Sequence, residues 1–188
     1  MTPVTQAVLE GQRGGGMEAS VTPLGYPAFP GTVQQIPPNA QNPQGQVRFI
    51  HVPLTFKSVQ HLQQAVVQYG RQSAYVKGLL PGLAAEHRLT PYDWELLTRT
   101  ILEAKALLQF KTWWKDEAEQ MARQKQACNV PITAEQPPGS GRYFGVRQQL
   151  QYDDASVVQV RLCCLRAWDK VESPRETAKS SMKTFTIS

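Results

Sequence analysis

Residues that could carry out catalysis or bind a metal are few and scattered in this chain of 188 residues. A catalytic cysteine needs a histidine and a third, orienting group, and Cys128 with any of the three histidines lacks that support. His51 has no second histidine or cysteine at ligand spacing, so we interpret it as a surface residue or part of an extended lead-in. Asp153 and Asp154 form an acidic pair that suits the start of a helix better than acid–base chemistry.

The sequence motifs of common enzyme classes are absent as well. There is no G-x-S-x-G, no H-E-x-x-H, no P-loop, and no G-x-G-x-x-G between a strand and a helix. The run Gly139-Ser140-Gly141 is typical of a turn and is weak evidence for phosphate binding. The four tryptophans fit a hydrophobic core better than a ligand-stacking surface. We therefore expect no catalytic residues, no cofactor and no metal site.

Charge and cysteine content restrict the function further. The formal net charge is +5, a mild excess without the clustered arginines and lysines of a dedicated nucleic-acid binder. Three cysteines make an odd number, which is typical of reduced, apolar cysteines in a cytosolic protein. No apolar run approaches the roughly 20 residues of a membrane span, and the start does not have the layout of a signal peptide. These features predict a soluble, cytoplasmic protein without a membrane partner.

Composition divides the chain into four parts. Residues 1–46 contain three consecutive glycines and many prolines but few apolar groups, which predicts a disordered arm, with a local hairpin near the start as the alternative. Residues 47–55 form a short apolar lead-in. Residues 56–171 carry apolar side chains at helical spacing, and residues 172–188 form a polar tail.

The helical part is organised around the stretch from Leu89 to Trp114, which is rich in large apolar side chains. Thr90 is suited to cap a helix in this stretch, with Pro91 at its first position. A helix with so many apolar groups must be covered by other helices, because each buried ring or leucine contributes roughly 2 kcal/mol. The flanking segments should therefore be helical and surround it.

Apolar spacing and cap residues place the other helices. We expect one helix over residues 56–69 and a second that starts after Ser73 and ends or kinks at Pro81. A fourth should begin near Glu103, followed by a loop over residues 129–140, a short helix over residues 143–150, and a long last helix capped by Asp153 or Asp154. The expected core consists of Val59, Leu62, Val66, Trp94, Leu97, Leu107, Phe110, Trp114, Val160 and Trp168.

Four stretches of this helical part resemble the capsid part of betaretroviral Gag. They read LTPYDWELL, LLQFKTWW, GSGRYF and QVRLCCLRAWDKV, and the likeness is to endogenous retroviruses of the K type in particular. The resemblance covers about Phe56 to Val171, in order and with natural spacing, and matches the N-terminal capsid domain. It implies an all-α fold, a retroviral capsid N-terminal domain-like bundle of about six helices with a disordered N-terminal arm.

The resemblance also implies a structural function, self-assembly into a hexameric capsid lattice. In related capsids the first three helices surround the centre of the hexamer. Carried over by position, this suggests an assembly face on the outer side of the first helix, with one residue from the second; each of these positions could equally be an ordinary solvated one. The candidate residues are Lys57, Gln60, Gln64, Gln68 and Lys77.

A second implication concerns a pair formed by Pro3 and Asp93. In related mature capsids a protease frees an N-terminal proline, the chain folds back as a β-hairpin, and the new amine pairs with a buried aspartate at the start of the third helix. The matching residues are Pro3 and Asp93. Met1 and Thr2 precede the proline here, so we expect Asp93 in this chain to act as a helix cap whose loss costs about 1 kcal/mol.

Several parts of Gag have no counterpart in this sequence. We find no motif of the second capsid domain, no zinc knuckle and no budding motif, so we expect a Gag fragment whose partners are itself or other capsid chains. The missing knuckle argues against nucleic-acid binding. Three hypotheses remain open: a viral structural protein found in the virion, a host-retained fragment that co-assembles with capsids and interferes with them, and a basic module with salt-dependent RNA binding.

Overall fold

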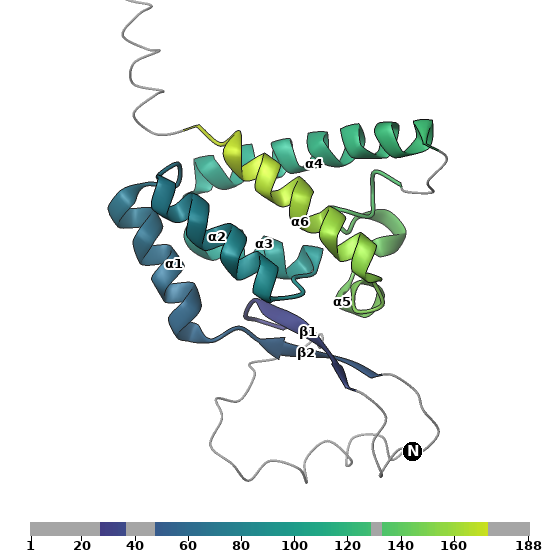
Figure 1. Ribbon diagram of the computed structural model, residues 1–188, viewed down its shortest axis with the longest axis horizontal. Coiled ribbons are helices and arrows are strands. Elements are labelled where there is room, and N and C mark those ends of the chain that lie inside the picture. Colours follow the sequence, from purple (N-terminus) through teal and green to yellow (C-terminus); the bar gives the residue numbers. More distant parts are fainter. Residues whose placement is uncertain (1–26, 37–47, 129–132, 173–188) are drawn as a thin grey trace, which may run out of the picture.

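The computed structural model describes residues 27–36, 48–128 and 133–172, which form a helical bundle with a small hairpin beneath it (Figure 1). The predicted all-α bundle is confirmed. No helix in these residues is long and apolar enough to cross a membrane. The elements are β1 (Gly31–Ile36), β2 (Arg48–Pro53), α1 (Phe56–Tyr69), α2 (Ala74–Glu86), α3 (Pro91–Ile101), α4 (Ala104–Ala127), a 3-10 turn (Gly141–Tyr143), α5 (Val146–Gln149) and α6 (Asp154–Asp169).

Side-chain caps determine where several helices begin. Ser73 accepts a hydrogen bond from the backbone N–H of Val76 at the start of α2, and Asp153 accepts one from Ser156 at the start of α6. Each side chain satisfies a backbone donor that has no partner within its own helix. Gly70 ends α1 with a φ of 85°, a conformation that glycine adopts without steric cost.

We expected α2 to end or kink at Pro81, and the structure shows that it does not end there but continues to Glu86. Proline removes one backbone hydrogen bond and crowds the preceding turn. Burial of one face of the helix offsets the free energy that the proline costs. Val76 and Leu80 before the proline and Ala84 after it lie on this face, and all three are buried.

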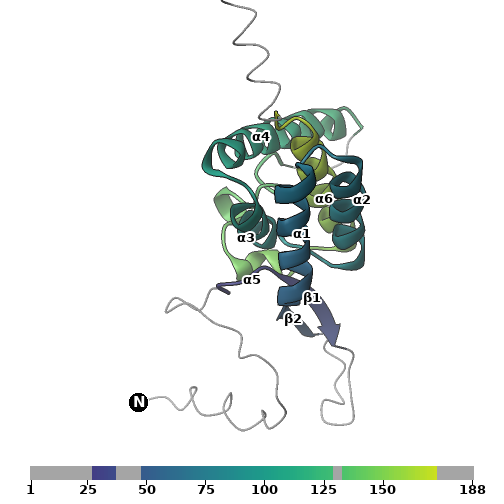
Figure 2. The ribbon, with the colours of Figure 1, turned by 90° about the vertical axis from the view of Figure 1, so that its left-hand side faces the viewer.

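The core is shared by all the long helices. Figure 2 shows α1 facing the viewer with α3 and α2 on its two sides, while α4 and α6 pack against each other. Eight of the ten expected core residues are buried, and Val66 and Leu107 are half-buried and pack against them. Trp94, Leu62, Leu97, Phe110 and Val160 are fully buried.

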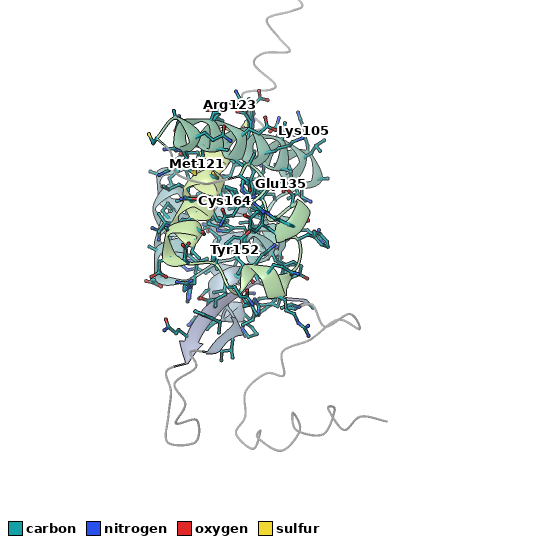
Figure 3. The ribbon with its side chains drawn as sticks, turned by 90° about the vertical axis from the view of Figure 1, so that its right-hand side faces the viewer. Lys105, Met121, Arg123, Glu135, Tyr152 and Cys164 are labelled. Carbon is teal, nitrogen blue, oxygen red and sulfur yellow. The ribbon has the colours of Figure 1, made fainter. Side chains whose placement is uncertain are left out.

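The contact between α4 and α6 combines sulfur atoms with a buried carboxylate that has cationic partners at its edge. The sulfur of Cys163 lies 3.8 Å from that of Met121, and Cys164 is also buried. Figure 3 labels Met121 on α4 and Cys164 on α6. Glu117 is buried on α4, and one of its carboxylate oxygens forms an ion pair with the Lys170 amine at 2.6 Å. A buried carboxylate needs such a partner, so this pair fixes how the end of α6 lies on α4.

The turn between α1 and α2 holds the C-terminal end of α6. The Gln72 amide donates hydrogen bonds to the carbonyl oxygens of Trp168 and Val171, at 3.0 and 2.9 Å. The Arg71 guanidinium donates to the carbonyl of Glu172, and the Trp168 indole N–H donates back to the carbonyl of Arg71. The final carbonyls of a helix have no donor within the helix. Here the side chains of Arg71 and Gln72, from the beginning of the helical sequence, supply the donors.

The hairpin includes residues for which we predicted a disordered arm. Strand β1 pairs with β2 in antiparallel register, from Gly31 opposite Pro53 to Ile36 opposite Arg48. The segment 31–36 carries little apolar alternation, so its sequence alone does not indicate a strand. Its backbone is bonded instead to a partner strand and to the loop before α3, where the Val33 N–H donates to the carbonyl of Arg88 at 3.0 Å.

Replacing either buried tryptophan should severely destabilise the domain. We expect Trp94→Ala and Trp114→Ala each to lower the free energy of unfolding by about 3–5 kcal/mol, because each removes a large buried ring. Trp113→Ala is the control: its ring is 37% exposed and lies 4.9 Å from the Lys170 amine, so its loss should cost less than that of either buried ring. Urea unfolding followed by circular dichroism measures all three, and an unchanged midpoint for either buried tryptophan would contradict the packing.

The three thiols should differ in reactivity. Burial raises the pKa of Cys163 to about 12, with a further contribution from Glu117, and burial raises the pKa of Cys164 well above its usual range. Cys128 is exposed. Because the thiolate is the reactive form, a thiol reagent at neutral pH should modify one cysteine per native chain quickly and the other two only after unfolding. Cys128→Ser should abolish the fast phase, and a fast phase that survives would contradict the burial.

Candidate functional site: the Asp93 carboxylate and the outer face of α1

Asp93 is the third residue of α3 and forms a capping box with Thr90. The Thr90 hydroxyl accepts a hydrogen bond from the Asp93 N–H at 3.2 Å. In return, one carboxylate oxygen of Asp93 accepts from the Thr90 N–H at 3.1 Å and from its hydroxyl at 2.6 Å. The side chain thus makes the local capping contacts expected from its position in the sequence.

The other carboxylate oxygen of Asp93 is bonded to the hairpin. It accepts a hydrogen bond from the Gly31 N–H at 2.7 Å and lies 2.6 Å from Nε2 of His51. Asp93 is completely buried and the His51 side chain is 10% exposed. A buried carboxylate is stable only when donors surround it, and here three separate segments of the chain provide them.

The sequence did not indicate that His51 and Gly31 belong to this site. We interpreted His51 as a lead-in or surface histidine, whereas the structure places its ring against Asp93. The two residues are 42 positions apart, and no periodic pattern connects positions that distant. Pro3 lies outside the described residues, and the strand that reaches Asp93 begins just after Pro30, so a Pro3–Asp93 pair stays a prediction.

The candidate assembly face lies on the outer side of α1. Its four α1 residues are all exposed, and the opposite side of the helix buries Val59, Leu62 and Ala65. Val67 lies among them and is 82% exposed, a feature that we did not single out from the sequence. Lys77 on α2 is also exposed, and its amine lies 3.5 Å from a carboxylate oxygen of Asp169. The exposed α1 residues are Lys57, Gln60, Gln64 and Gln68.

A groove of about 240 Å³ between α1 and α2 is lined by His61, Leu79, Leu83 and Glu86, among others. His61 is engaged there with the hydroxyl of Tyr75 at 2.9 Å. Within residues 27–36, 48–128 and 133–172, no group of three or more histidine, cysteine or acidic side chains could hold a metal ion.

Removing the Asp93 carboxylate should cost much more than removing an ordinary cap. We expect Asp93→Ala to lower the free energy of unfolding by about 3 kcal/mol or more, because it leaves buried donors unpaired on α3 and on the hairpin. This exceeds the loss expected from the sequence alone. Asp153→Ala is the matched control, an exposed N-cap whose loss should cost about 1 kcal/mol. Equal losses in urea melts would show that the hairpin contacts add nothing.

Comparison with known proteins confirms the resemblance. The gag protein p24 N-terminal domain family matches residues 50–175. Similar proteins include the Gag polyproteins of endogenous retrovirus group K members 6, 8 and 113 of Homo sapiens, each 36% identical over 158 residues. The match covers 81% of this chain and 24% of each relative, so the chain spans about a quarter of their length. This chain belongs to the gag protein p24 N-terminal domain family, whose members are structural proteins and not enzymes.

Proposed function

We propose that the domain is a building block that self-associates through the outer face of α1, together with Lys77 of α2, to form a hexameric capsid lattice. The observation that carries the proposal is a stripe of exposed, uncharged side chains along α1. Gln60, Gln64 and Gln68 follow one another at intervals of four residues, so they lie in one row on the helix surface.

The composition of this row favours contact with another protein chain. Burying an unpaired charge is costly, whereas glutamine amides can exchange hydrogen bonds with water for hydrogen bonds with a neighbour. Val67 adds an apolar group beside the row, three residues after Gln64, and is 82% exposed. Lys57, at one end of the row, makes no ion pair among the described residues.

A single contact of this kind should be weak, because small interfaces give transient association. The relatives are about four times as long as the part that this chain matches, and their other segments could add contacts of their own. We expect partners to be copies of this chain or other capsid chains, not a membrane or a nucleic acid. The place of action would be the cytoplasm, and the virion where the domain is part of a working Gag.

A charge placed in the row should block assembly without unfolding the domain. We expect the isolated chain to sediment as a monomer at low micromolar concentration and to assemble when concentrated or crowded, and Val67→Glu to prevent that assembly. The melting temperature should not change, because Val67 is exposed. Leu108→Glu on α4 is the matched control, an apolar residue that is 68% exposed on another face. Assembly of the Val67 variant at the wild-type concentration would refute this face.

The alternative function is interference with the assembly of related capsids. It is favoured by the 36% identity to the group K Gag polyproteins, because chains this similar can share a lattice contact. Co-expression with a full-length group K Gag distinguishes the two functions. Incorporation of this chain with a fall in particle yield supports interference, and particles formed by this chain alone support a structural role. Val67→Glu should remove either effect.

A further inference from the structure

One end of the hairpin, where Gly31 pairs with Pro53, is buried against the helical domain. Gly31 and Val33 are buried, whereas Gln34 and Gln35, farther along β1, are exposed. A two-stranded hairpin is at best marginally stable alone in water, so its place beneath the helices depends on its contacts there (Figure 1). The contacts that matter are therefore those made by the first residues of β1 and the last residues of β2.

Four hydrogen bonds dock the hairpin on the helical domain. The Val33 N–H donates to the carbonyl of Arg88 at 3.0 Å, and the Arg88 N–H donates to the hydroxyl of Thr32 at 2.9 Å. These two bonds join the hairpin to the loop before α3. The other two contacts, from the Gly31 N–H and from His51, end on the buried Asp93 carboxylate. His51 is thus the hairpin side chain that reaches the buried carboxylate.

The chemistry of Asp93 assigns the direction of the bond with His51. Three other donors already point at this carboxylate, so it acts as an acceptor and Nε2 of His51 carries the hydrogen. The position is also tightly fitted, because a Cβ on Gly31 would lie 2.6 Å from Nε2 and 2.6 Å from the carbonyl oxygen of Val52. Glycine at position 31 therefore allows the imidazole to lie over the strand and reach α3.

We infer that His51 docks the hairpin on Asp93 in the chain as it stands, in the place that the resemblance gives to a freed proline amine. A docked hairpin in this protein then requires no proteolytic cut and no terminal amine. His51 is a positioning residue in this arrangement, since it holds β2 and, through the β-ladder, β1 against the start of α3. A terminal amine arriving at Asp93 would have to displace one of its four present donors.

Amide hydrogen exchange of the full chain, followed by NMR at Gly31 and Val33, tests this inference, because both amides are bonded across the docking contact. His51→Gln keeps an N–H donor about as far from the backbone as Nε2, whereas His51→Asn carries the same amide on a shorter side chain. We expect exchange at both amides to rise at least about tenfold in the asparagine variant and to stay near the wild-type rate in the glutamine variant. Amides of α4 and α6 should keep their rates in both.

His61→Asn is the matched control, because this histidine is exposed on α1 and bonded to Tyr75. It should leave exchange at Gly31 and Val33 unchanged. Wild-type rates in both His51 variants would overturn the inference, since the backbone bonds would then suffice to dock the hairpin. Equal increases in both variants would also overturn it, because packing of the ring, and not its hydrogen bond, would then hold the hairpin.

Discussion

An ionised carboxylate that is removed from water must be surrounded by donors, and Asp93 finds its donors in three parts of the chain. The capping box with Thr90 belongs to α3 itself, while Gly31 and His51 come from the two strands of the hairpin. The same side chain therefore starts a helix and holds a second structural unit. The hairpin and the start of α3 depend on each other, because both donors to the second carboxylate oxygen of Asp93 come from the hairpin.

The helices could be predicted from the sequence because their determinants are local. Apolar spacing and the caps Ser73, Thr90 and Asp153 are all contained within single helices. Helix α2 continues past Pro81, where we expected it to end or kink, because burial against other helices stabilises it and local propensity does not include that burial. Motif resemblance added the family, and with it the expectation of an aspartate buried at the start of the third helix.

The hairpin and its donor could not be predicted in the same way. Strand β1 has little apolar alternation, and its partner follows only after residues 37–47, so no short-range hairpin signal joins them. His51 has an unremarkable sequence environment, and its role depends on the three-dimensional closeness of β2 and α3. The assembly face is an intermediate case. Its glutamine spacing is visible in the sequence, but the exposure of Val67 is a property of the folded helix.

The corner where Arg71 and Gln72 bind the end of α6 has a consequence for how the protein is made. The bonded residues are 96 to 101 positions apart, so they join the beginning of the helical domain to its end. During synthesis, α1 and α2 leave the ribosome long before their partner exists. Long-range contacts of this kind slow folding, because the loop between the two residues must close before they form. The domain can therefore close only after Glu172 has been released from the ribosomal tunnel, and until then its first helices have an uncovered apolar side.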